Sequence, residues 1–109
     1  MIPRCTVCDH GLMWIGWIEF DLLLGDVHSL KEKRAVVRPL VNELRRRFQI
    51  SAAEVDHHEL HRRTVVGVGC VAGERSHVIE VLDSAEHLVA GRGEFELLSA
   101  HRGFARSGD

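Results

Sequence analysis

Residues 14–24 read Trp-Ile-Gly-Trp-Ile-Glu-Phe-Asp-Leu-Leu-Leu, and this segment carries the clearest structural pattern in the chain. Its residues alternate between two sets. One face would carry Gly16, Ile18, Phe20, Leu22 and Leu24, and the other Ile15, Trp17, Glu19 and Asp21. A period of two with aromatic and branched side chains predicts a β-strand that buries one face. Gly25 and Asp26 are expected to end it.

The segment that follows predicts a helix of about five turns. Ser29 followed by Glu32 fits a capping box, in which each side chain satisfies a backbone amide of the first turn. Apolar residues then recur with helical spacing at Leu30, Val37, Val41, Leu44 and Phe48. Pro39 is expected to kink this helix, but the stripe stays in phase across it, so we expect one bent helix rather than two.

Two further strands are predicted after this helix. Residues 50–56 form a short strand, residues 57–63 a polar loop, and residues 64–72 a more buried strand. Gly67 and Gly69 lie on the opposite face of that strand from Val66, Val68, Cys70 and Ala72, and leave a bare strip of backbone. Trp17 is expected to cover the strip if the first strand lies alongside.

A second helix and a last strand complete the chain. Residues 73–76 lead into the helix, Gly91 is expected at its C-terminal cap, and residues 94–101 form the strand. The buried stripe of the helix consists of Val78, Leu82, Ala85 and Val89, widened by Val81 and Leu88.

The order of elements, β-α-β-β-α-β, predicts an α+β ferredoxin-like sandwich. We expect an antiparallel sheet with strand order 4-1-3-2 and both helices on one face. The 109 residues suit one domain, placed at residues 13–102. Residues 1–12 read as an irregular extension, which a wrongly assigned start codon would also explain, and residues 103–109 as a flexible tail.

The composition limits where the protein acts. No apolar run approaches the ~18 residues that span a bilayer, and the N-terminus lacks the pattern of a secretion signal. Three cysteines are too few for a disulfide scaffold. We therefore expect a cytoplasmic protein without a membrane partner.

Positive charge is concentrated in residues 31–47. This segment has a net charge of +5, although the whole chain has a net charge of −2. A helix start with nearby cations suits phosphate groups of RNA. The competing interpretation is an ordinary solvated helix face. The RNA-binding candidates are His28, Lys31, Lys33, Arg34, Arg38, Arg45, Arg46 and Arg47.

A second surface is the sheet face opposite the helices. The candidates for protein interaction there are Ile15, Trp17, Gly67 and Gly69. Homodimerisation through this face or through a strand edge is compatible with RNA binding. RNA recognition by base stacking on the central strands is not expected, because Trp17 is the only aromatic residue that they are expected to place on this face and the third strand offers glycines there.

Two groups of metal-ligating residue types occur in the sequence, and we expect neither to bind a metal ion. His57, His58 and His61 lie near carboxylates, but their spacing matches no established metal motif. Cys5 and Cys8 with His10 supply too few ligands for a closed zinc site. No nucleophile beside a base and no glycine-rich phosphate loop occurs, so we expect no catalytic residue and no cofactor, and a metal-dependent enzyme that uses His57, His58 and His61 is the least favoured alternative.

Three stretches together resemble the YlxP-like family of small bacterial proteins that carry a domain of unknown function. They are residues 27–34 (Val-His-Ser-Leu-Lys-Glu-Lys-Arg), 46–51 (Arg-Arg-Phe-Gln-Ile-Ser) and 53–57 (Ala-Glu-Val-Asp-His). The resemblance covers about residues 13–102 and implies a ferredoxin-like fold. Genes of the family tend to lie beside those for translation initiation and ribosome maturation, which implies a role near the small ribosomal subunit. We therefore expect a non-enzymatic factor that binds ribosomal RNA or the small subunit.

Overall fold

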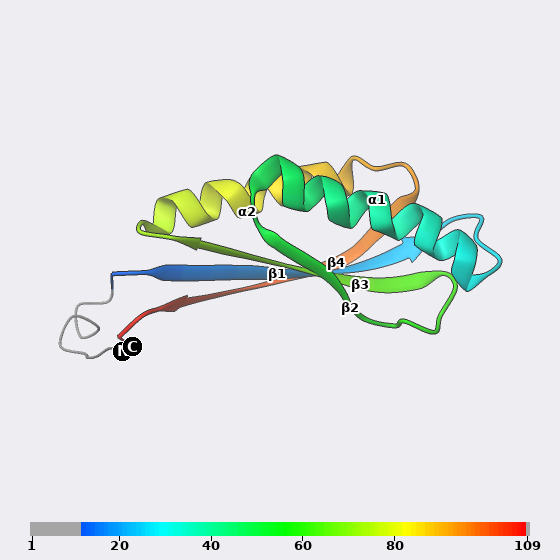
Figure 1. Cartoon of the computed structure of the whole chain (residues 1–109), viewed down its shortest axis with the longest axis horizontal. Coiled ribbons are helices and arrows are strands. Elements are labelled where there is room, and N and C mark those ends of the chain that lie inside the picture. Colours follow the sequence, from blue (N-terminus) through cyan, green and yellow to red (C-terminus); the bar gives the residue numbers. More distant parts are fainter. Residues whose placement is uncertain (1–11, 109) are drawn as a thin grey trace.

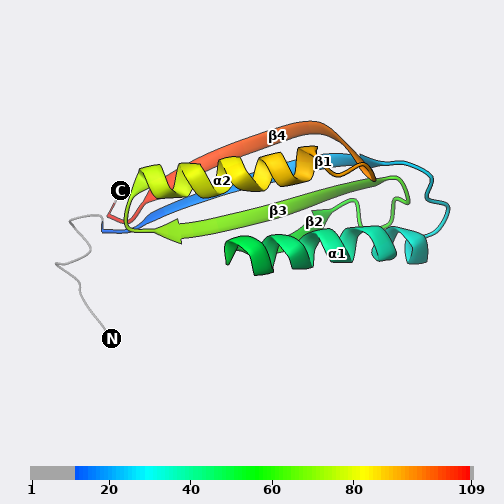
Figure 2. The ribbon, with the colours of Figure 1, turned by 90° about the horizontal axis from the view of Figure 1, so that it is seen from above.

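A computed structural model describes residues 12–108. Six elements follow one another: β1 (Trp14–Leu24), α1 (Leu30–Phe48), β2 (Ser51–Asp56), β3 (Arg63–Ala72), α2 (Arg75–Ala90) and β4 (Phe95–Arg106). All four strands form one antiparallel sheet in the order β2-β3-β1-β4. Both helices lie on the same side of it, so the domain has two layers (Figures 1 and 2). This confirms the predicted ferredoxin-like α+β fold and its strand order.

The core lies between the sheet and the helices. The alternating residues of β1 supply its centre, because Ile18, Phe20, Leu22 and Leu24 are fully buried. Helix residues such as Leu40, Leu44, Val78 and Leu82 close the core from above and are equally buried. Full burial of one such side chain stabilises the fold by about 1.5–3 kcal/mol. Within residues 12–108, no helix covers the other face of the sheet, which is called the open face below.

Helix α1 begins largely as the sequence predicts. The Oγ of Ser29 accepts a hydrogen bond from the backbone N–H of Glu32 (3.1 Å). The Glu32 carboxylate reaches back to the N–H of His28 (3.1 Å), one residue before the cap. The helix continues through Pro39 to Phe48, and Gln49 ends it in a left-handed conformation (φ 55°). The predicted single helix across Pro39 is therefore confirmed.

The last strand is longer than predicted. The sequence places its end at residue 101 and a flexible tail at residues 103–109, but β4 continues to Arg106. Arg106 pairs with Trp14, so β4 spans the whole length of β1. The N–H of Ser107 then donates to the carbonyl of Met13 (2.8 Å). The prediction was wrong because Gly103 interrupts the pattern and suggests a loop, whereas β1 pairs with residues 102–106 and so extends the strand.

No helix within residues 12–108 is long and apolar enough to cross a membrane.

A candidate nucleic-acid interface between helix α1 and strand β2

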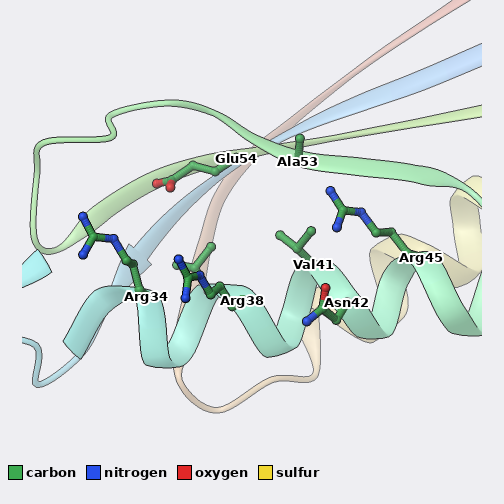
Figure 3. Close-up of a pocket in the computed structure, with 8 residues that line it drawn as sticks. Arg34, Arg38, Val41, Asn42, Arg45, Ala53 and Glu54 are labelled. Atoms are coloured by element: carbon green, nitrogen blue, oxygen red, sulfur yellow. The ribbon is translucent and has the colours of Figure 1, made fainter. Parts of the chain in front are cut away.

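A cleft of about 360 Å³ runs between α1 and the edge strand β2. Its cationic lining residues are Arg34, Arg38 and Arg45, all from α1. Figure 3 shows Arg34 and Arg45 extending from α1 on the side of β2 and Arg38 lying between them along the helix, with the Glu54 carboxylate between the helix and the strand. Asn42, Val37, Val41 and Ala53 complete the lining. This space is called the arginine cleft below.

Helical geometry explains why these arginines gather. Positions 34, 38 and 45 are four and seven residues apart, so at 3.6 residues per turn they lie along one side of α1. With a rise of ~1.5 Å per residue, the row is about 16 Å long. Lys31, one turn before Arg34, continues the same side. Glu43 lies on the other side and pairs with Arg92, which follows α2. The flank of α1 along β2 therefore carries cations without acids of its own.

Lys33 does not belong to this surface, although the sequence placed it among the RNA-binding candidates. Its side chain is only 2% exposed. The Nζ lies 2.7 Å from Oε2 of Glu54 and donates to the carbonyl of His57 (2.6 Å). The same Oε2 accepts a hydrogen bond from the buried Thr64 hydroxyl (2.6 Å). Lys33 thus ties α1 to the β2–β3 hairpin, and no part of it is available to a phosphate.

This buried pair also determines the charge of the cleft. Glu54 is the one carboxylate among the residues that line it. Because Lys33 neutralises Glu54 from the protein side, the charges of the three arginines are left unbalanced. No ion pair between described residues involves Arg34 or Arg38. The cleft is therefore a concave surface with a charge of about +3, summed over its lining side chains and Lys33.

Arg45 has a second role at the edge of the sheet. Its Nε donates to the carbonyl of Ala52 (2.9 Å), on the side of β2 that has no neighbouring strand. His58 Nε2 donates to the next outward carbonyl, that of Glu54 (3.2 Å). Side chains thus occupy two acceptors of a free edge. The terminal guanidinium nitrogens of Arg45 remain turned toward the cleft (Figure 3).

The other RNA-binding candidates lie outside the cleft. Arg46 and Arg47 are exposed at the last turn of α1, and Arg47 lies 3.6 Å from Glu43. His28 precedes the helix and pairs with Asp26 (2.6 Å), where both side chains are largely exposed. The sequence missed Asn42 as a cleft residue, although its position four residues after Arg38 on the same flank is the signal that would have found it.

The histidine loop does not converge on a common point. The carbonyl of His57 accepts from Lys33, and its backbone is left-handed (φ 59°). His58 turns back onto β2, and His61 is exposed. Within residues 12–108, no three His, Cys, Asp or Glu side chains gather as metal ligands would. Cys5, Cys8 and His10 lie outside the described residues.

The other arginines that belong to ion pairs serve the fold. Arg63 donates twice to Asp21 (2.8 Å each), and Arg92 pairs with Glu43. Burial alone would lower the pKa of Arg102, but hydrogen bonds to Glu86 and Asp83 raise that pKa above its usual value. These cations are therefore matched by carboxylates, unlike those of the cleft.

On the open face, Trp17 contacts a different glycine from those that the sequence predicts. Trp17 lies opposite Gly69 on β3 and Gly103 on β4. Its indole covers Gly103, where any side chain would collide with the ring, and leaves Gly69 uncovered. The prediction that Trp17 covers the β3 glycines is therefore wrong, because β4 reaches far enough to supply a glycine of its own. A shallow trough of about 340 Å³ remains over Gly67 and Gly69.

Comparison with known proteins finds relatives without an assigned function. The family model described as "Protein of unknown function (DUF503)" matches residues 15–102. The uncharacterized protein YlxP of Bacillus subtilis (strain 168) is 33% identical over 61 residues, which cover 56% of this chain and 66% of that relative. The match thus spans slightly less than two thirds of the relative's length.

Proposed function

This chain belongs to the DUF503 family of proteins of unknown function, and we propose that it is a non-enzymatic RNA-binding factor of the small ribosomal subunit. The arginine cleft is the contact surface, and it takes the phosphate groups of the RNA. The cytoplasm is the corresponding compartment. The observation that carries the proposal is the row Arg34, Arg38 and Arg45 in one cleft, in which a buried lysine neutralises the one acid that lines it within residues 12–108.

The chemistry of these side chains suits phosphate. A guanidinium group presents several N–H donors in a rigid plane, which matches two oxygens of a phosphate at once. Charge-assisted bonds of this kind position a nucleic acid without reading its bases. Asn42, which also lines the cleft, adds a neutral donor and acceptor suited to a ribose hydroxyl.

Ribosomal RNA is favoured among nucleic acids by the gene neighbourhood that the family resemblance implies. Positive charge in the cleft would attract RNA and an acidic protein alike, because both carry anionic groups. RNA differs in its regular phosphate repeat, which a straight row of helix arginines can follow. The proposal therefore concerns the RNA backbone of the small subunit rather than a particular sequence.

The test is co-sedimentation of the purified chain with small ribosomal subunits at low and high salt. We expect binding at low salt, lost as salt rises because counterions compete for the phosphates. Arg38→Glu should abolish the sedimentation. Arg46→Glu makes the same charge change on the same helix outside the cleft, and should retain it. Equal loss in both variants would contradict the cleft as the contact, and absence of binding at low salt would contradict the function.

The structure rules out one variant that the sequence alone would suggest as a test of RNA binding, the charge reversal of Lys33. Reversal of Lys33 would place two carboxylates together in a buried site and would damage the fold. Loss of binding in such a variant would carry no information about RNA. Arg34 and Arg38 are the informative positions because both are exposed.

A second candidate function is protein interaction through the open face. It is favoured by a specific observation, the apolar trough beside Trp17. The two functions use opposite sides of the sheet and do not exclude each other.

A further inference from the structure

We propose that two copies of this chain pair through their open faces, with the Trp17 indole of each copy seated in the trough over Gly69 of the other. This dimer does not depend on the RNA-binding function. It rests on the shape of the open face, on its charge and on its area.

The shape of the open face is complementary to itself. The Trp17 indole forms a low ridge that rests on β4, above Gly103. The trough lies over β3 and β2, between Trp17 and the exposed Val55, with Gly67 and Gly69 as its floor. A Cβ atom at Gly69 would meet no atom of the described residues within 4 Å, so this part of the chain leaves the floor uncovered. Ridge and hollow therefore lie side by side on one surface.

The strand order makes this arrangement suitable for a two-fold axis. The order is β2-β3-β1-β4, so an axis parallel to the strands and between β3 and β1 exchanges β1 with β3 and β4 with β2. Trp17, Gly69 and Ser51 lie at the same level along the strands. The axis thus places a ridge that rests on β4 over the β2–β3 trough of the second copy. Such an isologous contact closes after two chains.

The side chains of the open face are largely apolar near the trough. Trp17, Val55 and Val71 are 40%, 50% and 62% exposed, although all three belong to strands. Asp21 and Arg63 neutralise each other, which leaves Glu19 as the acid beside the trough. A carboxylate at this point disfavours nucleic acid as the occupant. A second copy buries the apolar side chains of both chains at once.

The available area is sufficient for a stable contact. The strands contain 11, 6, 10 and 12 residues. At ~3.4 Å per residue and ~4.8 Å between strands, the open face measures roughly 600 Å². Two such faces give roughly 1,200 Å², the lower limit of standard protein interfaces. Two packed sheets normally keep their strands within about 30° of each other, so most of this area can be used.

The competing route to a dimer is pairing at a strand edge. At β2 the outward carbonyls of Ala52 and Glu54 are already occupied by Arg45 and His58. Pairing there would require both side chains to move. The β4 edge is the other possible site, and the experiment distinguishes it from the open face.

The experiment is sedimentation equilibrium of the full chain over a concentration series up to about 100 μM. We expect the wild-type mass to approach twice the 12.3 kDa of one chain. Gly69→Lys fills the trough with a charged side chain and should weaken association at least tenfold. Ala90→Lys adds the same charge at an exposed position of α2 and should leave association unchanged. Raising the salt from about 0.1 to 0.5 M should not dissociate the wild-type dimer, because no ion pair holds it.

Two outcomes would overturn the proposal. One is a wild-type chain that remains monomeric throughout the series. The other is a dimer that Gly69→Lys leaves intact, which would assign the contact to the β4 edge instead. Thermal unfolding by circular dichroism checks that Gly69→Lys is folded, and Ser51→Lys, on the rim of the same trough, is the second variant. RNA binding by monomeric Gly69→Lys separates this proposal from the function of the arginine cleft.

Discussion

The two sides of the sheet carry different kinds of surface. At the edge of the helix side, the arginine cleft presents charges whose nearest acid is taken by Lys33. On the open side, the charges of Asp21 and Arg63 neutralise each other, and exposed apolar side chains surround a glycine floor. This contrast shows that counting charges does not by itself locate a binding site. What matters is which charges are already paired within the fold.

The physical consequence is a difference in salt dependence. Contacts between exposed charges are screened by salt, over a Debye length of about 8 Å at physiological ionic strength. Burial of apolar area depends little on salt. The cleft and the open face can therefore be studied separately by salt and by substitution.

The largest expected effect concerns Lys33, the buried lysine that neutralises Glu54 beside the cleft. Lys33→Ala leaves Glu54 with Thr64 but without a counter-charge in a mostly buried site. Removing one partner of a buried pair costs about 3–5 kcal/mol, and the partial exposure of Glu54 favours the lower end of this range. The measurement is chemical denaturation of both proteins.

The control for Lys33 is a double variant. Lys33→Met with Glu54→Gln removes both charges and should recover most of the lost stability. A Lys33→Ala protein within about 1 kcal/mol of the wild type would show that the pair is not the tie between α1 and the hairpin.

The second prediction compares two glycines of the open face. Gly103→Ala forces the Trp17 indole off β4, because the new Cβ occupies the position of the ring. Overpacking of this kind costs about 1–3 kcal/mol. Gly69→Ala adds a Cβ that is in open space in the single chain, so in dilute, monomeric protein it should leave the stability unchanged or raise it by about 0.5 kcal/mol. Equal effects of the two substitutions on the melting temperature would contradict the position of the indole.

The third prediction concerns individual phosphate contacts in the cleft. A plot of log affinity for single-stranded RNA against log salt has a negative slope. Arg34→Ala and Arg38→Ala should each make this slope less steep by about 0.7, because each removes one phosphate contact. Arg46→Ala should leave the slope unchanged because Arg46 lies outside the cleft. Titration of a fluorescent RNA at several salt concentrations gives these slopes, and a change in all three variants would indicate a diffuse basic surface.

Much of the fold could be predicted from the sequence because its information is local. Alternation in β1 and the stripe of α1 repeat every two and every 3.6 residues, and each pattern is complete within one element. The Ser29 cap is equally local. Once six such elements are in order, the handedness of connections leaves few topologies, and the ferredoxin-like arrangement follows.

The candidate site was predicted less well because pairing across the fold is not local. Lys33 has the same sequence signal as Lys31 or Arg34, a cation in a basic segment. Only the approach of Glu54, 21 residues later, identifies Lys33 as buried. Trp17 likewise had two possible glycine partners, and the length of β4 decided between them. In both cases the deciding residue lies in another element.

The smallest expected effect compares neighbouring positions on β3. Burial raises the pKa of the Cys70 thiol, which points to the helix side of the sheet. Near neutral pH the thiol stays protonated, so in protein diluted until it is monomeric it should react with iodoacetamide much more slowly than a Gly69→Cys thiol on the open face. The folded chain holds the Cys70 proton more tightly than the unfolded chain. This contribution to stability is complete below the ordinary value of 9.0 and is lost as the pH rises through the raised value. Mass spectrometry of the labelled peptide measures both rates, and rapid labelling of Cys70 at neutral pH would show that β3 opens on its helix side.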